Sequence, residues 1–280
     1  MIQQIIGQLF RILPAFRGKN RLASLFIWSR QKTVNALIEG KNNVKYYIPN
    51  IKEAIGFNLF VNGEYETDNI NFIVERIPEN GVFIDVGANI GAITVSIAKQ
   101  RPDARIIAIE ASPRVFEYLS KNIEVNNCAN VEIFNNAIAE EDDRNVPFYS
   151  PEELFGKGSL SPVFTAKPEM VQTITLDSLH KKITFPKVDF IKVDVEGFEK
   201  MIFLGGAELL SNDNAPKVLF EFSAWMESQL DDSKAGDAQR ILMDYGYKLF
   251  DATNPQRLTP ILEPKTDGDY MIYAQKQLLA

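Results

Sequence analysis

Short apolar runs of strand length recur along the chain and alternate with segments of helical apolar spacing. The runs are rich in β-branched residues, as is typical of strands that are covered on both faces. They occupy residues 82–86, 106–110, 131–134, 188–193, 217–222, 247–250 and 270–274. The alternation predicts an α/β fold with a doubly wound, mostly parallel sheet.

Two stretches interrupt this rhythm. Residues 43–62 alternate weakly between apolar and polar positions, which predicts short strands or a cap in front of a pocket. Between Arg144 and Leu176, two extended segments flank a loop rich in Gly, Ser and Pro. Insertions in a doubly wound fold tend to cover the ligand crevice, so we expect residues 144–176 to contribute to specificity.

The turn after the first strand carries the first candidate chemistry. Gly87 and Gly91 allow a tight turn that brings backbone N–H groups at a helix N-terminus close to a ligand. The loop departs from the NAD fingerprint G-x-G-x-x-G, because Asn89 stands in the place of its second glycine. Asp85 ends the strand, and Glu110 lies 23 residues beyond Gly87, about the distance at which an acid meets ribose hydroxyls. Both acids could instead be ordinary strand-end residues.

A second group of charged residues follows the strand at 188–193. Lys192 and Asp194 project to one face of it, and Asp194 and Glu196 fall at its C-terminal end, where open α/β sheets bind ligands. A carboxylate near a hydroxyl can serve as a base, which makes Asp194 and Glu196 candidate bases. Lys192 could offset their repulsion. Lys192 and Asp194 could equally form an ion pair that only joins the strand to its neighbours.

Length and composition bound the organisation of the chain. Its 280 residues, 45% of them hydrophobic, can bury one large core, which favours a single domain over residues 51–280 with an extension over residues 1–50. The lone Cys128 excludes an internal disulfide, and one Cys with one His argues against a zinc site of the usual kind. Because no run of roughly 18 apolar residues predicts a membrane-spanning helix, we expect a cytoplasmic protein.

The net charge of −7 is distributed unevenly. Residues 1–50 carry eight Lys or Arg and one acid, a net of +7, so residues 51–280 carry −14 and are not expected to bind nucleic acid. Six apolar residues of the basic segment share one helical face: Ile2, Ile5, Ile6, Leu9, Phe10 and Leu13. This face could rest on an anionic membrane, at the inner side of the bilayer. Amphipathic spacing more often marks a core-facing helix, which favours packing on the main domain or a homodimer through residues 1–30.

The two motifs have counterparts in a known family. The D-x-G-x-N-x-G loop at residues 85–91 resembles motif I of the class I S-adenosylmethionine (SAM) methyltransferases. The K-x-D-x-E-G-x-E block at residues 192–199 resembles the signature of FkbM-type SAM-dependent methyltransferases, and further matches run from Tyr65 to Tyr273. The resemblance implies a Rossmann-like class I methyltransferase fold, with a seven-stranded sheet whose last strand is antiparallel. Residues 1–50 lie outside the resemblance and are expected to form an N-terminal helical or cap extension.

The motifs and the resemblance together indicate site residues. The expected catalytic residues are Asp194, Glu196 and Lys192. The expected cofactor-binding residues are Glu66, Asp85, Gly87, Ala88, Asn89, Gly91, Glu110, Ala111, Ser112, Asn136, Ala137 and Asp194. No residue is assigned to a metal. Glu221 could join Asp194 and Glu196 around Mg²⁺, which the sequence does not require.

Three functions stay open on the sequence alone. The leading one is a SAM-dependent O-methyltransferase for a small-molecule or glycan acceptor, such as a sugar or a secondary metabolite. An NAD-linked oxidoreductase is weakened by Asn89 and by the second motif. A non-catalytic SAM-binding module is the third. The sole histidine, His180, is expected to be a bystander on a surface helix or turn.

Overall fold

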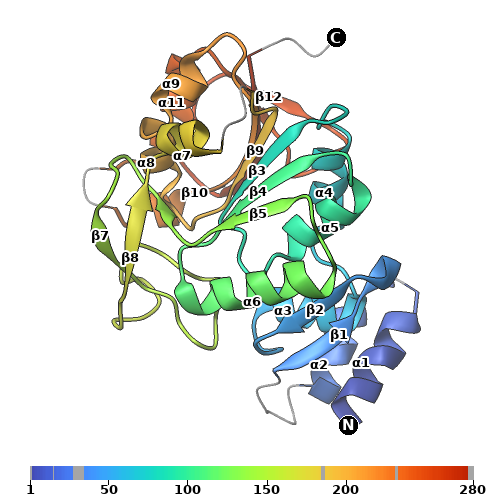
Figure 1. Cartoon of the computed structure of the whole chain (residues 1–280). Coiled ribbons are helices and arrows are strands. Elements are labelled where there is room, and N and C mark those ends of the chain that lie inside the picture. The colour runs from blue at the N-terminus through green and yellow to red at the C-terminus, as the bar shows by residue number, and fades with distance from the viewer. Residues whose placement is uncertain (1, 15, 28–34, 184–186, 231–232, 277–280) are drawn as a thin grey trace.

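The computed structural model describes residues 2–14, 16–27, 35–183, 187–230 and 233–276. Its centre is an eight-stranded sheet (Figure 1) made of β3 (Val82–Val86), β4 (Arg105–Ile109), β5 (Val131–Phe134), β9 (Phe190–Val193), β10 (Lys217–Ser223), β11 (Lys248–Asp251), β12 (Thr259–Ile261) and β13 (Asp269–Gln275). The strand order is β12-β11-β13-β10-β9-β3-β4-β5. The strands from β10 to β5 in this order run parallel, whereas β13 is antiparallel to both of its neighbours.

Helices cover both faces of this sheet. One face bears α4 (Thr67–Val74), α5 (Ala92–Gln100) and α6 (Pro113–Val125), and the other bears α7 (Leu176–Lys182), α8 (Glu199–Leu204), α9 (Ala207–Ser211) and α11 (Asp237–Asp244). Successive residues of β3 point to opposite faces, so Phe83 joins the core under α4 and α5, whereas Ile84 joins the core under α7 to α11. Burial on both faces explains why these strands are continuous apolar runs. The expected doubly wound Rossmann-like fold is therefore confirmed.

The sheet has one strand more than the resemblance implied. The last strand in the chain, β13, is antiparallel as expected. The eighth strand, β12, pairs antiparallel with the outer edge of β11, where Leu249 faces Ile261. Its short, proline-containing sequence lacks the apolar run of a central strand, because an edge strand is covered less completely.

The N-terminal part consists of α1 (Ile2–Ile12), α2 (Lys19–Ile27), a hairpin of β1 (Ala36–Glu39) and β2 (Lys45–Ile48) closed by a 3₁₀ turn (Lys41–Asn43), and α3 (Ala54–Asn62). Asn122 of α6 and Asn126, the C-cap residue of this helix, hold the hairpin. The Asn122 amide accepts from the backbone N–H of Tyr47 at 2.6 Å and donates to its carbonyl oxygen at 3.1 Å. Asn126 accepts from the backbone N–H of Lys45 at 2.8 Å. These hydrogen bonds fix the hairpin to α6, which covers one face of the main sheet. The division of the chain into an extension and a domain at residue 50 stays a prediction.

The weak alternation of apolar and polar residues at 43–62 predicted strands, and this prediction is only partly correct. Residues 45–48 form β2, but residues 54–62 form a helix instead of a second strand. Glu53 caps this helix by accepting from the backbone N–H of Ile55 at 2.7 Å, and Gly63 ends it in the left-handed conformation. Ile55, Leu59 and Phe60 are buried at the spacing of a helix. This burial determines the structure of the segment, although its apolar residues also alternate with a period of two.

The predicted insertion has its own small sheet. Strands β6 (Ala137–Ile138), β7 (Asn145–Phe148) and β8 (Glu169–Ile174) pair in the order β6-β8-β7, and the loop between β7 and β8 spans residues 149–168. A short helix, α10 (Ala224–Glu227), follows β10. Among the described helices, none is long and apolar enough to cross a bilayer.

Candidate functional site

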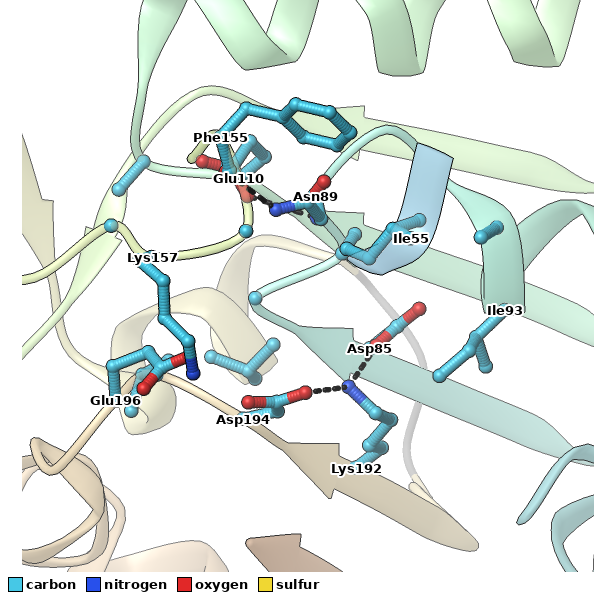
Figure 2. A pocket seen from close by; sticks show the side chains of 18 of the residues that line it. Ile55, Asp85, Asn89, Ile93, Glu110, Phe155, Lys157, Lys192, Asp194 and Glu196 are labelled. Carbon is cyan, nitrogen blue, oxygen red and sulfur yellow. Dashed lines mark hydrogen bonds and ion pairs between the residues drawn. The ribbon is translucent and has the colours of Figure 1, made fainter. Parts of the chain in front are cut away.

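A pocket opens at the carboxyl ends of β3, β4 and β9 (Figure 2), the edge at which open α/β sheets bind ligands. Its floor comes from the turn after β3 and from the strand ends. The loop of the insertion, through Phe155 and Lys157, forms part of the wall. Residues of the N-terminal part, among them Glu53, Ile55 and Tyr65, complete it.

The turn after β3 has three left-handed residues, Gly87, Asn89 and Gly91, and the first two explain much of its sequence. Gly87 has φ 79°, and a Cβ there would lie 1.9 Å from the carbonyl oxygen of Asp194. Asn89 has φ 53°, a region that asparagine tolerates better than most side chains. Its side chain donates to the carbonyl oxygen of Phe155 at 2.9 Å. Asparagine in the middle glycine place thus keeps the turn and also ties it to the insertion.

Gly87→Ala is expected to lower the free energy of unfolding by about 2 to 3 kcal/mol, because overpacking against a strand end adds to left-handed strain. Gly246→Ala is the matched control, since Gly246 has φ 87° but nothing lies within 4 Å of its Cβ position. It should lose only about 1 kcal/mol, from strain alone. Urea unfolding of both variants measures the difference. Equal losses would show that the close approach of Gly87 to β9 is unimportant.

Glu110 follows β4 and braces the turn. Its carboxylate accepts from the backbone N–H of Asn89 at 2.9 Å and from that of Ser112 at 2.8 Å. The residue is 6% exposed, and burial, above all, raises the pKa of Glu110 to about 7 despite these hydrogen bonds. Each carboxylate oxygen accepts only one of these bonds, so both keep a lone pair for further donors in the pocket.

Lys192 sits between two carboxylates in the floor of the pocket (Figure 2). Its Nζ lies 3.2 Å from Oδ2 of Asp194 and 3.7 Å from Oδ1 of Asp85. Lys192 is 2% exposed and Asp85 is fully buried, with Thr94 donating to its other oxygen at 2.6 Å. Burial opposes the charge of Lys192, but the carboxylates outweigh burial and raise its pKa. Lys192 therefore acts as a counter-ion that positions the two acids.

Asp194, Glu196 and Glu221 form a carboxylate cluster in the pocket, with ligand oxygens within 4.8 Å of one another. The charge of Asp194, and then burial, raise the pKa of Glu221 to about 9, and Glu221 is hydrogen-bonded to Asp194. Burial alone would raise the pKa of Asp194, but Lys192 and Glu221 outweigh it and lower that pKa. At neutral pH the Asp194–Glu221 pair thus holds one proton. The same three groups could hold a divalent cation.

Glu196 differs from the other two carboxylates in its backbone and in its partner. It has φ 54°, a left-handed conformation that strains a non-glycine residue, and Gly197 beside it has φ 100°. Its Oε1 lies 2.6 Å from Nζ of Lys157 on the insertion. Burial raises the pKa of Glu196, although Lys157 opposes the shift. Glu66, also in the pocket, shares the left-handed backbone with φ 47°, and such strain clusters at functional sites.

Glu199, the last acid of the second motif, stabilises the turn at residues 195–197 through its hydrogen bonds. Its Oε1 accepts from the backbone N–H groups of Val195 at 3.4 Å and Gly197 at 3.3 Å. The residue is 3% exposed, and burial, above all, raises the pKa of Glu199 from 4.5 to about 8. The folded protein therefore binds this proton more tightly than the unfolded chain does.

The Glu199 proton makes stability depend on pH. Its contribution is complete below the unfolded-state pKa of 4.5 and is lost as the pH rises through about 8. We expect the melting temperature to fall across this window, and to fall less steeply in Glu199→Gln, which cannot ionise. Glu208→Gln is the control, because the Glu208 side chain is exposed on α9. If the melting temperatures of wild type and Glu199→Gln depended on pH in the same way, the raised pKa of Glu199 would be contradicted.

The structure brings most of the expected site residues together. Those that line the pocket are Glu66, Asp85, Gly87, Ala88, Asn89, Glu110, Ala111, Asn136, Lys192, Asp194 and Glu196. Three lie behind its described lining: Gly91 as the N-cap of α5, Ser112 as the N-cap of α6, and Ala137 within β6. These three support the pocket without facing it.

Several pocket residues were not assigned to the site from the sequence. They include Glu53, Ile55, Tyr65, Phe155 and Lys157. The insertion was expected to cover the crevice, but its loop sequence did not indicate which residue would enter. Glu221, which also lines the pocket, was expected only as a possible Mg²⁺ ligand beside Asp194 and Glu196. Asn50, whose side chain donates to the carbonyl oxygen of Glu153 at 3.2 Å, joins the N-terminal part to the insertion.

Comparisons with known proteins agree with the fold and the motifs. "Methyltransferase 1" of Beauveria bassiana is 24% identical over 151 residues, covering 47% of this chain and 61% of that protein. The hexuronic acid methyltransferase AglP of Haloferax volcanii is 27% identical over 149 residues, covering 53% of this chain and 59% of that protein. The chain thus spans about three fifths of the length of these two relatives.

A solved TehB-like SAM-dependent methyltransferase of Corynebacterium glutamicum is 12% identical, with 78% of this chain and 92% of that chain covered and a TM-score of 0.45. The fold assignment rests on the strand order described above, not on this likeness. The model of the methyltransferase FkbM domain matches residues 85–249, which include both motifs and the insertion. Since this match covers more than half of the chain, the protein belongs to the FkbM methyltransferase family.

Proposed function

We propose that this protein is a SAM-dependent O-methyltransferase that acts on a hydroxyl group of a sugar, a glycan or a small metabolite. The observation that carries the proposal is the charge of the pocket. Seven carboxylates and two lysines line it: Glu53, Glu66, Asp85, Glu110, Asp194, Glu196 and Glu221, with Lys157 and Lys192. Family membership supports the same reaction class.

This charge distinguishes SAM from NAD. SAM bears a sulfonium and an ammonium cation against one carboxylate, so an acidic pocket attracts it. NAD bears a pyrophosphate with two negative charges, which the same pocket would repel. Even with protons on Glu110 and Glu221, five carboxylates exceed two lysines. The pocket therefore favours SAM, and the NAD-linked oxidoreductase alternative loses support.

The pocket residues fit the parts of this cofactor. Glu110 has free lone pairs for ribose hydroxyls, and the turn at Gly87 and Asn89 allows close approach of backbone groups. Asp194, ionised at neutral pH, can accept from an ammonium group. When bound, SAM supplies an electrophilic methyl carbon on a sulfonium leaving group.

An alcohol acceptor needs a base, and Glu196 suits that role better than Asp194. Its raised pKa makes it the stronger base, and Lys157 occupies only one of its oxygens. Glu196 would accept the hydroxyl proton of the acceptor, while the thioether released from SAM would keep the electron pair of the broken carbon–sulfur bond. The remaining residues hold the acceptor in line, which can supply much of the rate.

Two considerations bear on the acceptor and on a metal. Carboxylates bind sugar hydroxyls well, and one relative is named as a hexuronic acid methyltransferase, which favours a sugar or glycan. Lys157, Lys192 and the proton on Glu221 already balance most of the charge of the carboxylate cluster. We therefore expect that the reaction does not require Mg²⁺.

The test is transfer of a labelled methyl group from SAM to a panel of hexuronic acids, neutral sugars and small alcohols, with and without EDTA. The proposal expects an alkali-stable labelled ether whose formation EDTA leaves unchanged. Label released by mild alkali would indicate a methyl ester on a carboxyl group and would contradict hydroxyl methylation. Tight SAM binding without transfer to any acceptor would favour the non-catalytic alternative.

A further inference from the structure

Exposed apolar side chains are concentrated on the first two helices. Eight of the fourteen exposed large hydrophobic residues among the described residues lie between residues 5 and 26. On α1, Ile5, Leu9 and Ile12 are 51%, 59% and 81% exposed, and Leu13, just after this helix, is 44% exposed. On α2, Leu22 and Leu25 are 41% and 68% exposed. We call these six residues the α1–α2 face. Apolar patches of this kind on a soluble domain mark interaction sites.

The opposite side of α1 is packed, so the orientation of the helix is fixed. A Cβ at Gly7 would lie 2.6 Å from the ring of Phe60 on α3, and Phe10 is 7% exposed. Arg11 donates to the carbonyl oxygen of Phe60 at 2.7 Å. The α1–α2 face therefore points away from the core because the other side of α1 already contacts α3. Figure 1 shows α1 and α2 at the end of the molecule remote from α7 and α9.

The segment that carries this face is basic, although Glu39 and Glu64 act electrostatically on Arg11 and Lys19. Residues 1–38 contain six Lys or Arg and no acid, whereas residues 39–280 carry 24 − 37 = −13. Arg17, between the helices, and Arg21, on α2, are exposed. An anionic surface would attract this end of the protein and repel the remainder, which also sets the orientation of the molecule.

We propose that the α1–α2 face binds the surface of a membrane that contains anionic lipids, with its apolar side chains at the level of the headgroups and Arg17 and Arg21 on phosphates. Exposed apolar side chains beside arginines are typical of helices that lie in the interface. A second copy of the chain fits less well. A two-fold dimer through this face would bring the same basic segments together without acids to pair them.

The experiment is sedimentation of the whole protein with vesicles of phosphatidylcholine alone or of phosphatidylcholine mixed with phosphatidylglycerol. We expect binding to the mixed vesicles only, weakened by salt. Ile12→Asp with Leu25→Asp, and separately Arg17→Glu with Arg21→Glu, should each reduce binding by about tenfold or more. Leu262→Asp and Lys248→Glu, exposed at the far edge of the sheet, are the matched controls and should bind like wild type.

Analytical ultracentrifugation and thermal melting of the same samples keep the result interpretable. The altered side chains are exposed, so the variants should melt like wild type. Absence of binding to mixed vesicles by folded wild-type protein would overturn the proposal. A dimer that Ile12→Asp with Leu25→Asp dissociates, without vesicle binding, would also overturn it and assign the face to self-association. Equal binding to both kinds of vesicle would overturn the role of the arginines.

Discussion

Lys192→Met is expected to lower the free energy of unfolding by about 3 to 5 kcal/mol, the usual effect of removing one partner from a buried ion pair. Methionine preserves most of the volume but leaves two carboxylates without their counter-ion. Asp85 is fully buried, and its Oδ1 makes no hydrogen bond within the described structure. Asp85 must then either become protonated or stay charged away from water, and both are unfavourable. Urea unfolding at neutral pH measures the loss.

A second substitution tests the cause. In Asp85→Asn with Lys192→Met, the uncompensated charge of Asp85 is gone, so much of the stability should return. Lys45→Met, on an exposed residue of β2, controls for the loss of a lysine. If Lys192→Met changed stability by less than about 1 kcal/mol, the ordinary size of a surface substitution effect, Lys192 would not be the counter-ion of buried acids.

Glu196→Gln is expected to reduce the methylation rate by about 10² or more, the usual contribution of a positioned base. The amide keeps the shape and a hydrogen-bonding oxygen but cannot take the acceptor proton. Asp194→Asn should act differently, because we propose that Asp194 binds the cofactor, and its lowered pKa makes it a weak base. We expect it to weaken SAM binding more than it slows transfer at saturating SAM.

Single-turnover transfer of a labelled methyl group, with SAM titrations on the same variants, separates the two effects. Glu153→Gln is the control, since its side chain is 72% exposed and contacts Lys52. Full activity in Glu196→Gln at every pH would exclude it as the base. The reverse pattern, with the larger rate loss in Asp194→Asn, would assign the proton to Asp194 instead.

The sheet could be predicted because its strands carry local signals. Residues 82–86 are buried on both faces and read as a continuous apolar run, and the turn glycines mark where the strand ends. Asp85 and Glu110 could be placed at one edge because parallel strands end on the same side. The helix at residues 54–62 was harder to predict, because Phe57, Leu59 and Val61 show a period of two within a segment that tertiary packing makes helical.

The insertion could be predicted to cover the pocket, but the individual residues of the pocket wall could not, because long-range contacts place them. Lys157 reaches Glu196 across 39 residues of sequence, and Asn89 reaches Phe155 across 66. Neither Lys157 nor Phe155 belongs to a periodic segment that would fix its direction. The conformation of Asn89 could not be predicted either, because the sequence shows only that this residue departs from a glycine pattern. The left-handed backbone of the structure explains why asparagine is accommodated there.

Calorimetric titration of the protein with SAM and with NAD tests the central claim, that this acidic pocket is a SAM site, most directly. SAM should bind to one site, NAD should not bind, and Glu110→Ala should weaken SAM binding by about 1.5 to 3 kcal/mol, the contribution of a charged hydrogen bond. Glu117→Ala, on the exposed side of α6, should leave the affinity unchanged. Binding of NAD, or equal SAM affinity in Glu110→Ala and wild type, would contradict the account.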